Sequence, residues 1–269
     1  MGYNLQVLSD KVEIRDNNTK NSNILYSKNM NEVLKNADVV IAPLSSTDKK
    51  GNLKSTFIDK KITLNESFFN KLSKDTLFII GFINSDMKEI LENKKIDFIE
   101  LTKLDEIAIL NAIPTAEGAI KIGIEKTDFT LYHHNILILG LGRVGLTLGW
   151  RLNLLGANVY AATRSKAAIA RGKDLGLNMI NYNELNSYLS KMNIIYNTVP
   201  ALILNSKRIS NINKNCLIID LASSPGGTDF KAAENNNIKA ILASGLPGKI
   251  APKTAAQILT DVIPELIQD

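Results

Sequence analysis

The 269-residue sequence contains one cysteine, Cys216, and two histidines, His133 and His134. A single thiol excludes a disulfide framework. One thiol and two imidazoles also do not make a set of zinc ligands, and we therefore expect no metal site. Cys216 lies in the apolar run 216–219, which is typical of a buried strand thiol rather than a nucleophile. The two histidines precede the first strand of the carboxyl half, where a surface turn is expected.

The sequence also lacks a targeting signal, a long apolar run and a block of basic residues. Residues 1–5 show no basic stretch leading into an apolar core, and no run approaches the ~20 apolar residues of a membrane span. The net charge of +5 comes from lysines scattered among Asp, Glu and Asn, without interleaved aromatic residues. We therefore expect a cytoplasmic protein that binds neither a membrane nor nucleic acid.

The composition that remains, 45% hydrophobic and 22% charged, is that of a globular protein whose length suits two modest domains. Short apolar runs alternate with amphipathic stretches, a pattern typical of parallel α/β architecture. In the carboxyl half, helices are expected at 144–155 and 165–175, and strands at 135–139, 158–162, 193–198, 216–221 and 238–242. Residues 131–248 are thus predicted to form a Rossmann domain, a doubly wound parallel sheet.

The amino half, residues 1–114, shows the same alternation less regularly and predicts a smaller Rossmann-like or flavodoxin-like α/β domain. Its expected strands are 3–8, 39–42, 77–80 and 96–100. Residues 115–130 are predicted to link the domains through a helix over 115–126. The last segment, 249–269, predicts a helix from Pro252 that packs back on the first domain and that Pro264 kinks or interrupts.

The strongest local signal is the glycine-rich turn formed by Gly140, Gly142 and Gly145, with Arg143 and Val144 between them. The pattern is weak alone, but here it follows an apolar strand, opens a helix and precedes a second strand at the expected spacing. The first glycine permits the turn, the second lets a phosphate approach, and the third lets helix and strand pack closely. The turn therefore predicts binding of a nicotinamide dinucleotide at the amino terminus of the helix.

The end of the second strand bears on which dinucleotide binds. A cofactor with a free ribose hydroxyl usually meets Asp or Glu there, but this sequence has Thr163, Arg164, Ser165 and Lys166. A guanidinium, two hydroxyls and an ammonium can neutralise and hydrogen-bond a ribose 2′-phosphate. NADP is therefore favoured over NAD, the alternative being that Arg164 is a solvated residue at a helix start.

Two further strand ends lie on the edge where doubly wound sheets bind ligands. Thr198, Val199 and Pro200 follow one of them, and Ala222 follows the other, so these residues are candidate cofactor contacts. Asn197 and Asp220 end the strands themselves, and for each a role in capping the turn is as plausible as a ligand contact.

Four segments on the same edge together resemble the family of dipicolinate synthase A subunits: NAIPTAEG (111–118), NTVP (197–200), DLASSPGGTDF (220–230) and GLPGKIAPKTA (245–255). The resemblance covers nearly the whole chain. It implies an oxidoreductase that works with a separate B subunit, in an oligomer, in the mother-cell cytoplasm of a spore-forming bacterium. The expected product is dipicolinate, the pyridine dicarboxylate of the spore core, made from a lysine-pathway intermediate.

The sequence departs from the family pattern in two places. In the family, a strand with a Gly-Gly-Asp turn and a helix precede the segment that matches 3–8, so we expect the amino-terminal domain to be truncated at its start. The position of Ser224 is often Arg or Lys in the family, so a role there in binding a substrate carboxylate passes to another group, for which Lys253 is the nearest candidate.

Oxidation of a dihydropyridine to a pyridine requires a hydride acceptor, a base and groups that hold two carboxylates. Glu117 is the candidate base, Lys253 the candidate carboxylate ligand, and Asp229 a third candidate catalytic residue. Thr115, Ser224, Gly226, Gly227 and Thr228 complete the expected substrate contacts, the glycine amides acting as anion donors. The competing interpretations are a solvated glutamate, a surface lysine and an ordinary loop turn.

Two other functions remain open at this point. A 2-hydroxy-acid dehydrogenase shares the plan but needs a histidine base beyond the nucleotide strands, and His133 and His134 lie at the opposite edge, which disfavours it. The chain could instead be an NADP-binding regulatory or assembly subunit without catalysis of its own.

Overall fold

The computed structural model describes residues 5–8, 24–44, 47–48, 50–53 and 61–268, and the chain divides into two compact units, Met1–Asp105 and Glu106–Asp269. Each unit contains parallel strands joined by helices, so the predicted α/β class is confirmed. The two units are described separately below.

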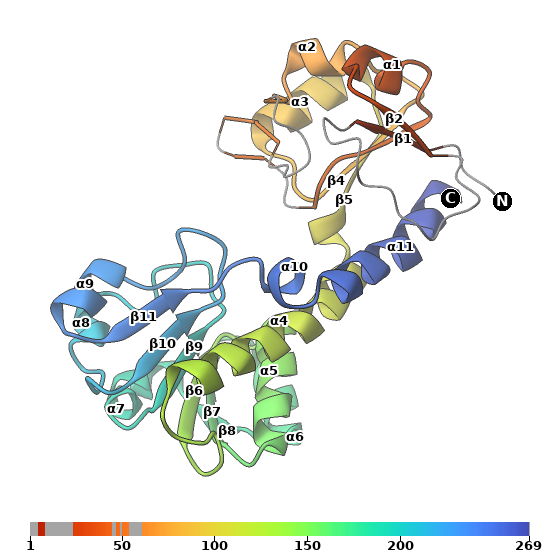
Figure 1. Cartoon of the computed structure of the whole chain (residues 1–269). Coiled ribbons are helices and arrows are strands. Elements are labelled where there is room, and N and C mark those ends of the chain that lie inside the picture. Colours follow the sequence, from red (N-terminus) through yellow and green to blue (C-terminus); the bar gives the residue numbers. More distant parts are fainter. Residues whose placement is uncertain (1–4, 9–23, 45–46, 49, 54–60, 269) are drawn as a thin grey trace. The chain divides into compact units, whose positions relative to one another are not determined.

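The second unit is built on a six-stranded parallel sheet with the order β11-β10-β9-β6-β7-β8 (Figure 1). Counted along the chain this is the 3-2-1-4-5-6 order of a Rossmann fold, so the predicted doubly wound sheet is confirmed. The order reverses between β6 and β9, which places the ligand-binding crevice at their carboxyl ends. The strands are β6 (Asn135–Leu139), β7 (Asn158–Ala162), β8 (Asn178–Ile180), β9 (Ile194–Asn197), β10 (Leu217–Asp220) and β11 (Lys239–Leu242).

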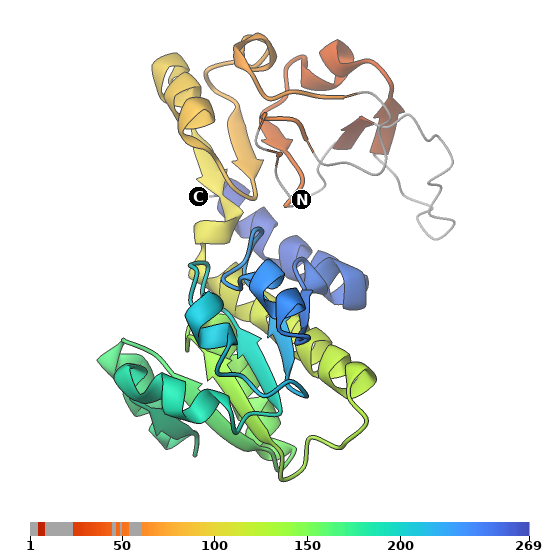
Figure 2. The ribbon, with the colours of Figure 1, turned by 90° about the vertical axis from the view of Figure 1, so that its left-hand side faces the viewer.

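Both faces of this sheet are covered by helices (Figures 1 and 2). Alternate residues of β6 show why: Ile136 and Ile138 join one buried cluster, and Leu137 and Leu139 join the other. The first cluster is closed by α4 (Asp105–Lys126), α5 (Arg143–Leu154), α6 (Lys166–Asp174) and α10 (Leu246–Ile250), and the second by α7 (Leu185–Leu189), α8 (Ser206–Ile209) and α9 (Phe230–Asn235). A short 3-10 turn, Tyr182–Glu184, precedes α7.

Helix α4 differs from the predicted linker because it begins at Asp105 instead of 115 and runs through Pro114. Its small residues Ala116 and Ala119 are fully buried against the sheet, and the hydroxyl of Tyr196 donates to the carbonyl of Ala119 at 3.2 Å. In the described part of the chain α4 is also the one helix with the length and apolar composition of a membrane span. The sequence did not predict it as such, because charged and polar residues interrupt its apolar residues. Its packing is that of a core helix of the second unit.

The last helix, α11 (Pro252–Gln268), starts at the predicted proline and buries Ile258 and Val262. The expectation that Pro264 interrupts the helix was wrong, because the helix continues for four residues beyond it. Proline removes one backbone donor, and near a helix end this loss affects few hydrogen bonds.

The first unit contains a three-stranded parallel sheet of β3 (Val39–Ile41), β4 (Leu77–Ile80) and β5 (Phe98–Glu100), and a separate parallel pair of β1 (Leu5–Leu8) and β2 (Ile24–Ser27). The pair β1–β2 includes a strand, β2, that the sequence pattern did not predict. The helices of this unit are α1 (Met30–Leu34), α2 (Glu66–Phe69) and α3 (Ser85–Lys94), followed by a 3-10 turn, Leu101–Lys103. Phe68, Phe69 and Phe78 meet edge to face in its core.

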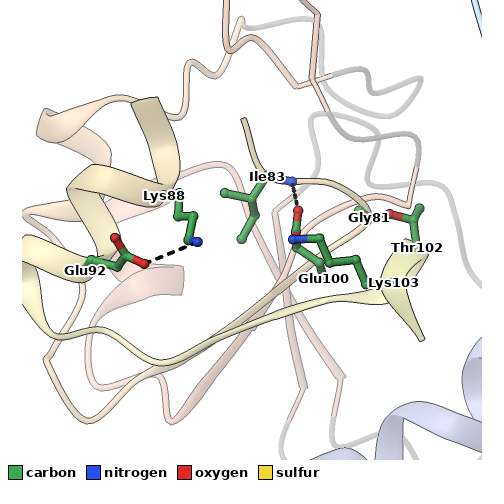
Figure 3. A network of polar contacts seen from close by, with 7 residues as sticks. All are labelled: Gly81, Ile83, Lys88, Glu92, Glu100, Thr102 and Lys103. Carbon is green, nitrogen blue, oxygen red and sulfur yellow. Dashed lines mark hydrogen bonds and ion pairs between the residues drawn. The ribbon is translucent and has the colours of Figure 1, made fainter. Parts of the chain in front are cut away.

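A buried carboxylate organises the carboxyl edge of this smaller sheet (Figure 3). Glu100 ends β5 with its side chain 5% exposed, accepts the backbone N–H of Ile83 at 2.7 Å and pairs with the ammonium of Lys103. Beside it, the hydroxyl of Thr102 donates to the carbonyl of Gly81 at 2.6 Å. These bonds fix the turn that leaves β4, which is a structural role.

Candidate functional site

The glycine-rich turn between β6 and α5 has three glycines with three different surroundings. Gly140 has φ +89°, and a Cβ there would lie 2.6 Å from the hydroxyl of Thr198 and 2.7 Å from the side chain of Val199. A Cβ on Gly145 would overlap the carbonyl oxygen of Gly140. These two positions need glycine for the fold of the turn and for the contact between helix and strand.

Gly142 is different because the protein itself leaves space around it. It has φ −79°, is exposed, and a Cβ there would meet nothing within 4 Å. It also stands at the amino-terminal cap of α5, a 12-residue helix whose first amides have no partner within the helix. A free space beside the first amides and the positive end of a helix fits a pyrophosphate, and no contact with a described residue explains the glycine.

The end of β7 presents the predicted cluster of cations and hydroxyls. Arg164 and Lys166 are exposed, and neither forms a hydrogen bond or ion pair with the part of the chain that the structure describes. Ser165 caps α6 by accepting the N–H of Ala168 at 3.3 Å, and Thr163 accepts the N–H of Ser165 at 3.4 Å. Both hydroxyls keep their protons for donation, so all four groups remain able to bind an anion.

The segment after β9 packs against the first glycine. The hydroxyl of Thr198 lies 3.0 Å from the carbonyl oxygen of Leu139 and 3.2 Å from that of Gly140. The side chain of Asn197 holds Val199 at both ends: its oxygen accepts the N–H at 3.1 Å and its nitrogen donates to the carbonyl at 3.0 Å. Thr198 and Val199 therefore form the wall beneath the turn, with Pro200 exposed beyond them.

Asp220, at the end of β10, is fully buried and accepts four hydrogen bonds. One oxygen accepts from the side chain of Asn197 at 3.1 Å and from the N–H of Ala222 at 3.0 Å. The other accepts from the N–H of Gly227 at 2.8 Å and from the hydroxyl of Thr228 at 2.6 Å. Asn197 and Asp220 thus organise the loops around them.

In this structure the predicted anion donors of the 220–230 segment form bonds within the chain. The donors of Gly227 and Thr228 are used by Asp220, and the N–H of Gly226 donates to the carbonyl of Ser223 at 2.8 Å. None of the three is free to bind a substrate carboxylate. The N–H of the buried Ala222 likewise donates to Asp220, which leaves its side chain as the group that can contact a cofactor.

Asp229 is the amino-terminal cap of α9, where its carboxylate accepts the N–H of Ala232 at 2.9 Å. This contact explains the residue without a catalytic role. Ser224 is exposed at the tip of the loop, where its hydroxyl is available to a ligand.

The remaining candidates lie on α4 and α11. Glu117 is exposed in the middle of α4, and Thr115 donates its hydroxyl proton to the carbonyl of Asn111 at 2.7 Å. The adjacent Gly118 contacts Leu246 of α10, the helix that follows the carboxyl end of β11, so this part of α4 lies toward the carboxyl edge of the sheet.

Lys253 is exposed in the first turn of α11, just after α10. Neither Lys253 nor Glu117 forms a hydrogen bond or ion pair with a described residue. Both side chains are therefore available to a ligand at this edge.

Comparison with known proteins identifies the family. The family model for the N-terminal domain of the dipicolinate synthase A subunit matches residues 2–102. The A subunit of dipicolinate synthase from Bacillus subtilis (strain 168) is 39% identical over 232 residues, which are 86% of this chain and 78% of that relative. The chain belongs to the family of dipicolinate synthase A subunits. The family expected from the four motifs is confirmed.

Solved structures agree with this assignment. Crystal structures of the dipicolinate synthase A subunit from Bacillus halodurans and of the A chain from Bacillus subtilis match with TM-scores of 0.85 and 0.84, at 34% and 38% identity. Each match covers 92% of this chain, and 85% and 84% of the two relatives. A transhydrogenase from Sinorhizobium meliloti, at 13% identity and a TM-score of 0.64 over 91% of this chain and 78% of its own, shares the fold alone.

The cofactor class follows from a second family model. The NAD binding domain of D-isomer specific 2-hydroxyacid dehydrogenases matches residues 115–225, the region that contains the glycine-rich turn. The chain therefore binds a nicotinamide dinucleotide and has an oxidoreductase-type role.

The feature that sequence reasoning missed is the network between Asn197 and Asp220. For each residue the sequence left open a role in capping its turn or in contacting a ligand, and no spacing in the sequence shows that both side chains are buried and in contact. Neighbouring positions in β9 and β10, Asn197 opposite Asp220, would have been the signal once the strand order was known.

Proposed function

We propose that this chain is the dinucleotide-binding subunit of a dipicolinate synthase, which oxidises dihydrodipicolinate to dipicolinate with NADP during sporulation, together with a B subunit. The observation that carries the proposal is the open approach to Gly142 at the start of α5, in a chain 39% identical to the A subunit of a dipicolinate synthase. The name of that relative implies a second subunit.

The residues that would hold the cofactor lie on four neighbouring strand ends. The amides of the Gly140–Gly145 turn would bind the pyrophosphate, with Arg143 and Val144 at its helix end, and Thr198, Val199, Pro200 and Ala222 would line the rest of the dinucleotide. Thr163, Arg164, Ser165 and Lys166 would bind the 2′-phosphate of NADP. The bound dinucleotide supplies a hydride acceptor.

The chain's own contribution to the reaction is to hold the dicarboxylate and to take up one proton. Loss of a hydride and a proton converts the dihydropyridine ring to a pyridine, so the reaction balances with NADP as the oxidant and one base. Glu117 is the group proposed to accept the proton, and Lys253, with the hydroxyl of Ser224, would bind the substrate carboxylates. Their exposure toward the carboxyl edge of the sheet, without partners among the described residues, supports these roles.

The decisive experiment is to assay this chain, the separately purified B subunit, and their mixture for dipicolinate formation and NADPH production. Formation of both products by the mixture, or by this chain alone, supports the proposal. If the mixture makes neither although its B subunit is supplied as an active protein, the proposed reaction is wrong. If this chain binds NADP and only raises the activity of its partner, it is a regulatory subunit.

Variants separate the substrate roles from cofactor binding. Glu117→Gln and Lys253→Ala are expected to lower turnover of the mixture while the NADP dissociation constant stays nearly unchanged, because neither residue lies at the glycine-rich turn. Glu125→Gln is the matched control, since Glu125 is an exposed residue at the carboxyl end of α4 that pairs with Lys121 at 3.3 Å. Loss of NADP binding with normal turnover at saturating cofactor would reverse the assignment.

A further inference from the structure

We propose that Asp220 is a positioning residue that couples the dinucleotide turn to the loop of residues 222–228, so that cofactor binding orders the loop that carries Ser224. The inference rests on the proposed function in naming a substrate at that loop, but the coupling itself does not depend on turnover. Three groups of contacts carry it.

The first contacts join the glycine-rich turn to Asn197. Val199 and Thr198 lie directly against Gly140, so closely that a methyl group on that glycine has no room. The N–H and the carbonyl of Val199 are both bonded to the side chain of Asn197, at 3.1 Å and 3.0 Å. A dinucleotide bound at the turn would lie beside Thr198 and Val199. Any displacement of Val199 would change its two hydrogen bonds to the side chain of Asn197.

The second contact joins Asn197 to Asp220. The two residues are opposite each other on β9 and β10, both are fully buried, and the amide of Asn197 donates to one carboxylate oxygen at 3.1 Å. No described residue pairs with Asp220 as a cation, so the four neutral donors alone stabilise its charge. Each of these donors is therefore held tightly.

The third contacts join Asp220 to the loop. Its second oxygen holds the N–H of Gly227 at 2.8 Å and the hydroxyl of Thr228 at 2.6 Å. The carbonyl of Gly227 in turn accepts the N–H groups of Ile203 and Leu204 at 2.9 Å and 3.0 Å. A side chain on Gly227 would overlap the carbonyl oxygen of Ala201, so the loop is fixed in one place at its base. The exposed tip, with Ser223 and Ser224, lies between this base and Ala222, whose N–H donates to the other oxygen of Asp220 at 3.0 Å.

We call the contacts that run from Gly140 through Val199, Asn197 and Asp220 to Gly227 and Thr228 the relay. The variant that tests it is Thr228→Val, which keeps the shape of the side chain and removes one donor to Asp220. Thr228→Ser restores the hydroxyl and serves as the rescue. Thr76→Val is a matched control, because Thr76 is a buried threonine of the first unit, 1% exposed, whose hydroxyl donates to the carbonyl of Ala37 at 2.9 Å. It loses the same kind of bond without touching the relay.

The first measurement is amide hydrogen exchange of residues 221–229 with and without NADPH. In the wild-type chain, in Thr228→Ser and in Thr76→Val, we expect NADPH to slow exchange about fivefold or more, a typical size for coupling between two sites. In Thr228→Val the effect should vanish. Exchange that NADPH does not slow in the wild type, or slows equally in Thr228→Val, would overturn the relay, since the second result means direct contact with the cofactor. The wild-type result stands even if Thr228→Val does not fold.

The second measurement is the steady-state reaction of the chain with the B subunit. Thr228→Val should lower kcat/KM for the dihydropyridine substrate about tenfold to a hundredfold, as expected when a group near the substrate is misplaced, while KM for NADP stays nearly unchanged. Thr228→Ser should recover most of the loss. Equal losses for both substrates, or the same loss in Thr76→Val, would show a general effect of stability instead. A wild-type complex without turnover would refute the proposed function and leave the exchange result to decide the coupling.

Discussion

An added methyl group would meet different surroundings at each glycine of the turn after β6. Substitutions there can therefore distinguish a glycine needed for folding from one needed for binding the dinucleotide. We expect Gly142→Ala to change the free energy of unfolding by less than about 1 kcal/mol, the usual range for changing a glycine at a helix cap. Its affinity for the dinucleotide should fall at least about tenfold, because the added methyl group occupies the space beside the first amides of α5. Thermal denaturation and calorimetric titration measure the two effects.

Gly145→Ala is the control for that substitution. Its methyl group would overlap the carbonyl oxygen of Gly140, so it should destabilise the fold by about 1–3 kcal/mol, as overpacking in a core does. If Gly142→Ala bound the dinucleotide as tightly as the wild type, the pyrophosphate would not lie where we place it.

Arg164 decides the preference for NADP in our proposal. A hydrogen bond to a charged group contributes about 1.5–3 kcal/mol, so Arg164→Ala should weaken NADP binding roughly tenfold to a hundredfold. NAD, which has no 2′-phosphate, should bind as before. Titration of both cofactors measures this, with Arg171→Ala as the matched control, since Arg171 is an exposed arginine in the last turn of α6, the helix that follows Arg164. Equal affinities of the wild-type chain for NADP and NAD would contradict the proposal.

Cys216 shows how burial controls reactivity at one residue. Burial raises the pKa of its thiol to about 12, so almost no thiolate exists in the folded protein near pH 8. We expect negligible reaction with Ellman's reagent in native buffer, rapid reaction in guanidinium chloride, and a native rate that rises with pH without levelling off near the ordinary thiol pKa of about 8.5. A native rate that levels off there would mean an ordinary, accessible thiol.

At the residue scale, the sequence is most informative where the chemistry is local. The glycine roles depend on the strand and helix that flank them, and the cations after β7 follow one another in the chain, so both were predictable. The bonds from Gly227 and Thr228 to Asp220 were not predictable, because Asp220 is seven and eight residues away in the sequence and its burial depends on neighbouring strands. A polar side chain that faces inward cannot be told from one that faces a ligand by residue type alone.

At the scale of elements, apolar runs predicted five strands of the second sheet, and β8 was missed because only Met179 and Ile180 are apolar in it. The first part of α4, before residue 115, was not predicted, and Pro114 lies at the point where a proline disfavours helix in the preceding residue. The helix tolerates it, since Pro114 is buried and the following Thr115 bonds back to the carbonyl of Asn111. Tertiary packing outweighs the local cost of the proline.

The contact between α4 and β9 gives a test of that packing. A methyl group on Gly123 would overlap the hydroxyl of Tyr196, whereas the nearest other side-chain atoms, on Ile194 and on the tyrosine ring, lie at 3.5 Å and 3.6 Å. Gly123→Ala alone should therefore destabilise the unit. In a Tyr196→Phe background the same change should be neutral or stabilising by up to about 1 kcal/mol, because alanine favours helix more than glycine does.

Chemical denaturation of the four proteins in this cycle measures the sign change directly. Tyr196→Phe alone should cost about 1 kcal/mol, since it removes the bond to the carbonyl of Ala119. Additive effects of the two substitutions would show that α4 does not pack on β9 as described.

At the scale of the whole chain, dinucleotide binding is proposed for one of the two compact units. All the residues proposed to bind the dinucleotide, and both core clusters of the six-stranded sheet, belong to Glu106–Asp269. Helix α4 lies almost entirely in this unit and closes one of its clusters, although the sequence pattern marked residues 115–130 as a linker. The boundary between the units therefore falls after the first residue of α4, so a fragment that starts at residue 106 keeps nearly the whole helix.

A fragment of residues 106–269 should fold cooperatively and bind the dinucleotide nearly as tightly as the full chain, because it keeps both clusters and every proposed cofactor contact. A fragment of residues 131–269 should not, since it exposes the faces of β6 and β9 that Ala116 and Ala119 cover and leaves the hydroxyl of Tyr196 without its acceptor. Circular dichroism melts, binding of a hydrophobic dye and calorimetric titration with NADP distinguish a folded unit from a loosely packed one. Equal melting temperatures for the two fragments would mean that the second unit folds without α4 and that the helix serves only as a link between the domains.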